Sequence, residues 1–142
     1  MKHTKSSGFS LIELMIVIVV LGTLTTLAVS SYERYVQKAR RTKAKADLLE
    51  LTQLIERNFT ESNRFDQDAA GNAYTLAFTT SPRTGRTFYN LSFPAGQPTA
   101  TTYIVQAVPT GSQTNDTLCM TLTLNQAGVR TESGTGTVAD CW

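Results

Sequence analysis

The feature that most constrains this chain is a run of apolar residues from Phe9 to Val29. The run is about as long as the roughly 20 residues that a helix needs to cross the hydrocarbon core of a bilayer. The preceding segment, residues 1–8, carries Lys2, His3 and Lys5 and no acidic residue. Positive charge holds that end of a membrane helix on the cytoplasmic side. The pattern predicts one membrane helix that delivers the rest of the chain to the far side.

Two processing schemes fit such an N-terminal segment. An ordinary signal peptidase would cut at the small residues 28–30, after an apolar core from Leu14 to Leu27, and would release a soluble domain. Glu13 argues against that scheme. Insertion scales give an acidic residue at the centre of a membrane helix a cost of about 2.5 to 3.5 kcal/mol, and a signal peptide gains nothing from a carboxylate at the edge of its apolar run.

The residues Gly8-Phe9-Ser10-Leu11-Ile12-Glu13, followed by 14–17, resemble the N-terminal signature of type IV pilins and of type II secretion pseudopilins. The resemblance implies that an aspartyl membrane peptidase cuts between Gly8 and Phe9 and then methylates the new Phe9 amine. It also implies an assembly role for Glu13, whose carboxylate would neutralise the Phe9 amine of a docked subunit, because buried charges are tolerated when paired. The alternative is that Glu13 merely reaches a lipid headgroup.

The helix is expected to continue well beyond the membrane. Neither proline nor glycine occurs from Thr23 to Ala70, and apolar residues recur at steps of three or four at Leu48, Leu51, Ile55 and Phe59. This spacing predicts an amphipathic helix that ends near Ser62. Residues 9–61 would then form one helix about 80 Å long.

Short runs of β-forming residues follow an irregular loop, residues 63–87, in which one short strand is expected at Tyr74–Phe78. An antiparallel meander is predicted from Thr87–Phe93, Thr102–Val108 and Leu118–Leu124, and Asn125–Gly128 should form a hairpin turn into Val129–Glu132. The fold class is therefore α+β. The resemblance implies the pilin ladle fold: a long N-terminal helix packed on an antiparallel sheet of about four strands, with a C-terminal disulfide-bounded region.

Cys119 and Cys141 are the two cysteines of the chain. Because the predicted membrane helix places them outside the cytoplasm, we expect a structural disulfide between them. Three parts are expected: a cleaved leader, residues 1–8; the transmembrane and filament-core half of the stem helix, residues 9–30; and a periplasmic head, residues 31–142, which includes the amphipathic half of the stem helix.

Basic side chains crowd the helix just after the membrane run, with Glu33 as the one opposing charge until Asp47. They are Arg34, Lys38, Arg40, Arg41, Lys43 and Lys45. The simplest interpretation is a solvated helix face that attracts anionic headgroups. The alternatives are contact with acidic groups on neighbouring subunits and, less favoured, contact with nucleic acid.

Enzymatic chemistry finds little support in this sequence. His3 is the single histidine and would leave with the leader, both cysteines are expected to be oxidised, and no metal-ligand spacing such as HExxH occurs. We therefore expect no catalytic residue, no metal and no cofactor in the mature chain.

The run 118–130 and the ending Cys141-Trp142 look similar to minor pilins of the PilE kind. The resemblance implies a minor type IV pilin that helps initiate or prime pilus assembly and serves adhesion and twitching motility. It would lie in the inner membrane with its head in the periplasm, and then in the pilus on the cell surface. Its partners would be other major and minor pilins, the prepilin peptidase/methyltransferase, the inner membrane and the pilus assembly platform.

Two alternatives within the family stay open. A DNA-binding competence pilin would use a basic patch with stacking aromatics, for which the candidates are Arg83, Arg86, Arg130, Tyr89, Tyr103 and Trp142. A type II secretion pseudopilin shares the N-terminal signature. The resemblance implies that many pseudopilins stabilise their C-terminal region with a bound calcium ion. A pseudopilin is disfavoured here because residues 109–142 lack the dense aspartate cluster of a calcium loop.

Overall fold

A computed structural model describes residues 8–142, apart from the side chains of Leu27 and Ser30. The basic residues of the expected leader, Lys2, His3 and Lys5, lie outside the described part. The chain forms two compact units, one that ends at Val36 and one from Gln37 to Trp142. Each is described here by itself.

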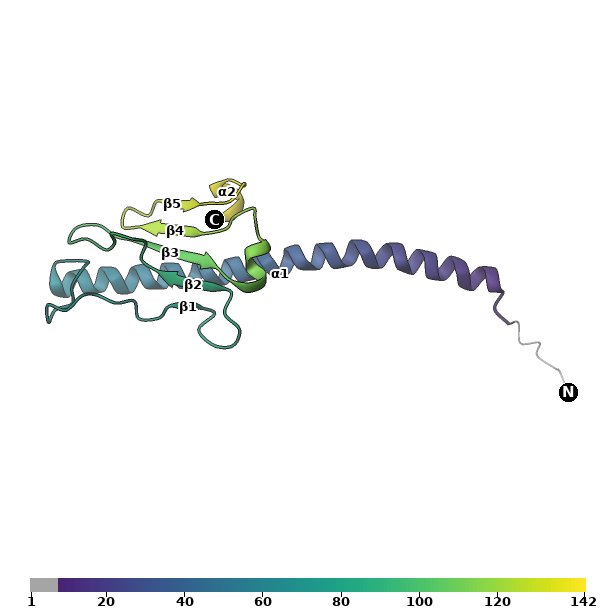
Figure 1. The fold of residues 1–142 in the computed structure, drawn as a ribbon, viewed down its shortest axis with the longest axis horizontal. Helices are drawn as coiled ribbons and strands as arrows, with labels where there is room; N and C mark the ends of the chain where they lie inside the picture. The colour runs from purple at the N-terminus through teal and green to yellow at the C-terminus, as the bar shows by residue number, and fades with distance from the viewer. Residues whose placement is uncertain (1–7) are drawn as a thin grey trace. The chain divides into compact units, whose positions relative to one another are not determined.

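A single long helix, α1, begins at Leu11 in the first unit and ends at Ser62 in the second (Figure 1). The prediction of an unbroken helix is thereby confirmed, with a start two residues later than expected. The helix ends because Asn63 adopts a left-handed conformation, with φ 57°, and its N–H donates to the Phe59 carbonyl at 2.7 Å. Asparagine is one of the few residues that enter this region at low cost.

The second unit contains an antiparallel meander whose five strands lie in sequence order (Figure 1). The strands are β1 Thr80–Ser81, β2 Tyr89–Ser92, β3 Ile104–Pro109, β4 Leu122–Asn125 and β5 Arg130–Glu132. A 3-10 helix, η1, spans Gly111–Asn115, and a short helix, α2, spans Val138–Cys141. The α+β class and the meander are confirmed, and the strands are shorter than the predicted runs.

The strand predicted at Tyr74–Phe78 is wrong. Tyr74, Leu76 and Phe78 do alternate with exposed residues and pack against the core. Their backbone pairs with no strand, however, and the first strand begins later, at Thr80. The alternation reflects the burial of every second side chain. The segment lacks the ladder of backbone hydrogen bonds that defines a strand.

The predicted hairpin between β4 and β5 is confirmed. The Asn125 side-chain oxygen accepts hydrogen bonds from the backbone N–H groups of Ala127 and Val129, at 3.0 and 2.9 Å. Gly128 supplies the left-handed residue of the turn, with φ 74°, which glycine adopts without steric cost.

The core lies between the second half of α1 and one face of the sheet. The helix contributes its apolar stripe of Ala44, Leu48, Leu51 and Ile55, and the sheet contributes alternate residues of its strands, Leu91, Val105, Ala107, Leu122 and Leu124. Burial of each large side chain stabilises the fold by roughly 1.5 to 3 kcal/mol. The period of three to four in the helix and of two in the strands explains why these positions meet.

The outer edge of β5 is covered by the end of the chain. The Trp142 indole N–H donates to the Thr131 carbonyl at 2.9 Å, and α2 lies beside the same strand (Figure 1). An edge acceptor that would otherwise face solvent is therefore occupied.

Candidate functional site

The apolar helix of the first unit is not covered by the described part of this chain. Its large apolar side chains between Phe9 and Val29 are 47% to 82% exposed. An 18-residue window of α1 has a mean hydropathy of 2.4, so the helix is long and apolar enough to cross a membrane. Such a surface is stable only against lipid or against other proteins.

Polar groups inside this apolar segment find partners within the helix itself. The hydroxyls of Thr23, Thr25 and Thr26 donate to carbonyls three or four residues earlier, at 2.7 to 2.9 Å. This matters because a bilayer core offers no water to satisfy a hydroxyl. The threonines are therefore compatible with a membrane or with a filament core.

Glu13 is the one charged residue between Phe9 and Tyr32, and it lies in the first turn of α1. Gly8 and Phe9 precede the helix in irregular, exposed backbone. The residues predicted for processing and assembly therefore lie together at the start of the helix, with the peptide bond between Gly8 and Phe9 outside regular structure.

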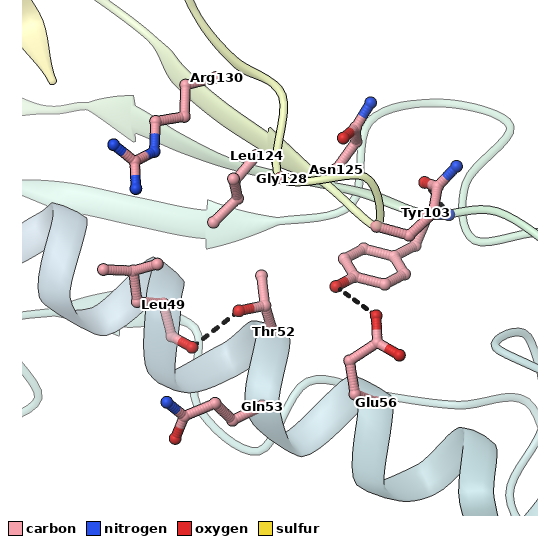
Figure 2. Close-up of a pocket in the computed structure, with 10 residues that line it drawn as sticks. Leu49, Thr52, Gln53, Glu56, Tyr103, Leu124, Asn125, Gly128 and Arg130 are labelled. Carbon is pink, nitrogen blue, oxygen red and sulfur yellow. Dashed lines mark hydrogen bonds between the residues drawn. The ribbon is translucent and has the colours of Figure 1, made fainter.

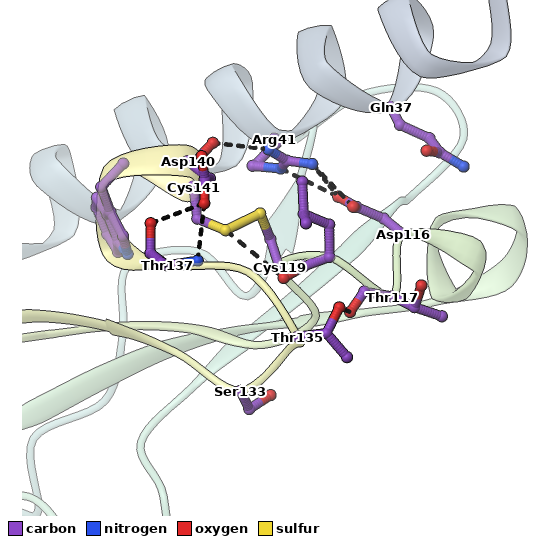
Figure 3. The surroundings of a disulfide bond; sticks show 12 residues. Gln37, Arg41, Asp116, Thr117, Cys119, Ser133, Thr135, Thr137, Asp140 and Cys141 are labelled. Atoms are coloured by element: carbon purple, nitrogen blue, oxygen red, sulfur yellow. Dashed lines mark hydrogen bonds and ion pairs between the residues drawn. A yellow bond between two sulfur atoms is a disulfide. The ribbon is translucent and has the colours of Figure 1, made fainter.

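The disulfide between Cys119 and Cys141 is formed, and both sulfur-bearing residues are fully buried (Figure 3). It closes the segment Ser133–Trp142, called the lobe below, onto the start of β4. Backbone N–H groups of Ser133 and Gly136 donate to the carbonyls of Thr121 and Leu118, at 3.1 and 2.8 Å. The predicted disulfide is present in the structure.

A buried ion pair fastens this region to α1. The Arg41 guanidinium donates to both carboxylate oxygens of Asp116 at 2.8 to 3.0 Å, and the two side chains are 8% and 2% exposed (Figure 3). A third bond from Arg41 reaches the Asp140 carbonyl of the lobe at 3.3 Å. Gln113 of η1 donates to Asp116 at 3.2 Å and to the Tyr89 hydroxyl at 3.0 Å. Sequence reasoning placed Arg41 on a solvated face; its partner, 75 residues away, carried no sequence signal.

The basic patch suggested by the sequence does not exist as one surface. Arg83 forms ion pairs with Glu50 and Asp47 of α1, so its charge is compensated. Arg83 also belongs to the β1–β2 loop, whereas Arg130 lies on β5 at the other edge of the sheet. Tyr89 and Tyr103, at 0% and 1% exposure, belong to the core and offer no stacking face.

Two arginines instead gather around one phenylalanine at the β1–β2 side. The Arg40 guanidinium lies 3.8 Å from the centre of the Phe88 ring, and that of Arg86 lies 5.8 Å from it. Arg40 also donates to the Ser112 hydroxyl of η1 at 3.1 Å. Within residues 8–142, neither arginine forms an ion pair with a carboxylate. The result is a concentrated, uncompensated positive charge held by a ring and a hydroxyl.

A second group of basic side chains, Lys45 and Arg130, lies at the β5 side. Burial lowers the pKa of Lys45, and the nearby charges of Arg41, Lys38 and Arg130 lower it further. The Arg130 guanidinium lies 5.5 Å from the Trp142 ring. Lys45 donates to the Trp142 carbonyl at 3.1 Å. Of the residues predicted for a basic patch, the structure brings Arg130 and Trp142 together.

Next to this group, a groove of about 520 Å³ runs between α1 and the β4–β5 turn (Figure 2). Leu49 and Leu124 line it from the helix and from the sheet, and Arg130 stands at one end. At the other end the Tyr103 hydroxyl donates to a Glu56 carboxylate oxygen at 2.9 Å. Burial raises the pKa of Tyr103, and the bond to Glu56 raises it further.

Comparisons with known proteins match both parts of the chain. Residues 3–29 match the prokaryotic N-terminal methylation motif. Residues 30–123 match the family described as type IV minor pilin ComP, DNA uptake sequence receptor. Together the two matched segments run from the predicted membrane helix through most of the sheet.

Two curated relatives share about a third of the aligned residues. The type II secretion system core protein G of Aeromonas hydrophila is 34% identical over 71 residues, which is 50% of each chain. The type IV major pilin protein PilA of Myxococcus xanthus is 30% identical over 67 residues, 47% of this chain and 30% of that protein. The chain therefore spans half the length of these relatives, or less.

Among solved structures, the non-core minor pilin PilV of Neisseria meningitidis superposes with a TM-score of 0.50 at 18% identity. The superposition covers 70% of this chain and 89% of that one, and at this identity it establishes the fold alone. The ComP family model matches well over half of the chain, including most of the sheet and the second half of α1. The chain belongs to the type IV minor pilin ComP family.

Proposed function

We propose that this chain is a structural subunit of a type IV pilus, without enzymatic activity, that is inserted in the inner membrane and then built into the filament. Cleavage between Gly8 and Phe9 and methylation of the Phe9 amine would precede assembly. One observation carries the proposal: among the described residues, the large apolar side chains between Phe9 and Val29 are exposed, while the second unit has its own closed core. Lipid covers such a helix before assembly, and other pilins cover it afterwards.

Within this proposal the Phe9 amine and Glu13 govern docking. A carboxylate among packed apolar helices is strongly unfavourable unless a cation compensates it. Cleavage at Gly8 would create such a cation, four residues before Glu13. The Glu13 carboxylate of an incoming subunit would pair with the Phe9 amine of the subunit already in place, and this pairing would set the axial position. The partners implied by this proposal are other major and minor pilins, the peptidase and the assembly platform. The subunit would help to prime assembly and so support adhesion and twitching motility.

The experiment replaces Glu13 by alanine in the full chain. We expect the mature protein to begin with methylated Phe9, as measured by mass spectrometry of the membrane fraction, and to be lost from sheared filaments. Glu33→Ala is the matched control, because Glu33 is an exposed carboxylate on the same helix beyond the apolar run. Incorporation of Glu13→Ala at the level of the control would refute the docking role.

DNA binding is the second candidate function, and it rests on the Arg40, Phe88 and Arg86 cluster. Uncompensated guanidinium groups bind phosphate well, because their planar donors match its oxygens. The matched family is described as a DNA uptake sequence receptor, which supplies the class of ligand. The phosphates of a DNA strand would contact both arginines on this side of the head.

The test is the salt dependence of DNA binding. Replacing both arginines, Arg40→Gln with Arg86→Gln, should weaken binding of a labelled duplex and reduce the slope of log K against log salt by up to about 2, since each phosphate contact contributes about 0.9. Arg57→Gln is the control, because Arg57 is exposed and already paired with Glu61. An unchanged slope in the double variant would exclude this surface as the DNA site.

A further inference from the structure

The groove beside β5 combines an apolar lining with a cation at its mouth. Leu49 is 41% exposed, although the neighbouring positions of its helix, Leu48 and Leu51, are fully buried. The side chains of Leu49, Leu124 and Thr52 converge on the groove, and the Tyr103 to Glu56 bond marks its other end (Figure 2). At about 520 Å³ the groove has room for several side chains.

The cation at the mouth is uncompensated within the described residues. Arg130 forms no ion pair with a carboxylate of residues 8–142, and its guanidinium lies over the Trp142 ring. The Lys45 ammonium lies close by, on the carbonyl of the same Trp142. The groove is therefore complementary to an aliphatic side chain that stands close to a carboxylate.

The same head carries that combination on its lobe. In the second unit the exposed large apolar side chains are Leu49, Leu118, Val129 and Val138. Val138, at 40% exposure, begins α2, and the exposed Asp140 follows two residues later. One oxygen of Asp140 accepts hydrogen bonds from the Thr137 backbone and hydroxyl, at 3.0 and 2.7 Å. Its other oxygen accepts no hydrogen bond from residues 8–142, so the carboxylate can still receive a cation.

We propose that the groove of one copy of this chain binds the lobe of a second copy, with Val138 between Leu49 and Leu124 and the Asp140 carboxylate on Arg130. The two surfaces are different patches of one head, so the contact is heterologous. A heterologous contact whose rotation does not close produces an open helical filament. The inference rests on the proposed filament function and adds a contact between heads to the packing of the helices.

The experiment places the photo-reactive residue benzoylphenylalanine at Gln53, which lines the groove from α1. The full chain is expressed in the bacterium, irradiated in membranes and in filaments, and the cross-linked peptides are identified by mass spectrometry. We expect a species of twice the mass, with the cross-link in residues 133–142 of the second copy. Cross-linking to another region of this chain, or to a different pilin, would overturn the proposal.

Charge exchange makes the test specific. Arg130→Glu should reduce the cross-link at least tenfold, Asp140→Arg should do the same, and the double variant should restore most of it. Arg130→Glu combined with Glu61→Arg is the matched control and should not restore it, because Glu61 is an exposed carboxylate away from the lobe. Trp142 fluorescence during urea unfolding checks that each variant still folds. Equal loss in both double variants would refute the pairing.

Filament content is measured in parallel to separate the two proposals. Chains that enter filaments normally but give no cross-link to the lobe would refute the groove contact and leave the pilin function standing. Chains absent from filaments under all conditions would overturn both proposals.

Discussion

Removing the carboxylate of Asp116 should destabilise the head far more than removing an exposed one. Asp116→Ala leaves the Arg41 guanidinium, 8% exposed, without the three bonds that Asp116 now accepts from it. Breaking a buried pair from one side costs about 3 to 5 kcal/mol, because an uncompensated charge stays buried. That loss is a large share of the roughly 5 to 15 kcal/mol by which a domain is stable.

The assay is urea unfolding of the full chain in detergent micelles, followed by Trp142 fluorescence. The chain has one tryptophan, and it lies in the head, so the signal reports the unit of interest. With a slope of about 1 to 3 kcal/mol per molar urea, the expected loss lowers the midpoint by at least about 1 M.

A matched variant and a double variant decide the reasoning. Glu61→Ala breaks an exposed i,i+4 pair with Arg57, whose side chains are 53% and 75% exposed, and should cost only about 0.3 to 0.5 kcal/mol. The double variant Arg41→Met with Asp116→Leu should recover most of the loss, since apolar replacement of a buried pair is often neutral or stabilising. A midpoint for Asp116→Ala equal to that of Glu61→Ala would refute the account.

Three further outcomes are expected from the same assay. Replacing both Cys119 and Cys141 by alanine should cost about 3 kcal/mol, the chain-entropy estimate for a sequence separation of 22, and reductant should then have no further effect. Gly134→Ala should destabilise the lobe more than Gly128→Ala, because the added carbon would meet the Leu118 carbonyl oxygen. At Gly128 the space is open, and the cost is that of a left-handed φ of 74°, about 1 to 2 kcal/mol; equal costs would argue against that close approach. Burial raises the pKa of Tyr103 above its ordinary 10.0, so the stability that this residue contributes should be complete below pH 10 and decline above it, and Tyr103→Phe should flatten that decline.

The sequence predicted the fold well where a period repeats over many residues. The apolar run from Phe9 and the stripe at Leu48, Leu51 and Ile55 specified one long helix. A helix that is apolar on all sides gives a continuous apolar run, and a helix packed on one side gives apolar residues at steps of three or four. Strands β2 to β5 were located to within a few residues, and β1 was not predicted. The strand expected at Tyr74–Phe78 failed because alternation of side chains does not reveal whether a neighbouring backbone is available.

The surfaces of the head were predicted poorly, for a physical reason. Whether a charge is free depends on a partner that is distant in sequence: Arg41 meets Asp116, Arg83 meets Glu50, and Arg40 meets Phe88. No periodic pattern in the sequence predicts these contacts. Cys119 and Cys141 were an exception, since two cysteines allow one pairing within the chain. Gly8 and Phe9 belong to a contiguous motif, which is why a sequence can point to them, and cleavage between them stays a prediction.

The Trp142 indole on the Thr131 carbonyl has a consequence for the time before assembly. A strand edge with vacant backbone groups invites pairing with any extended segment of a crowded neighbour, which is how many β-rich proteins begin to aggregate. Here β5 is three residues long, and one of its carbonyls is already occupied by the indole. For the proposed pilus subunit, this edge is therefore a poor template for sheet-to-sheet association, and contacts between heads on this side are left to side chains.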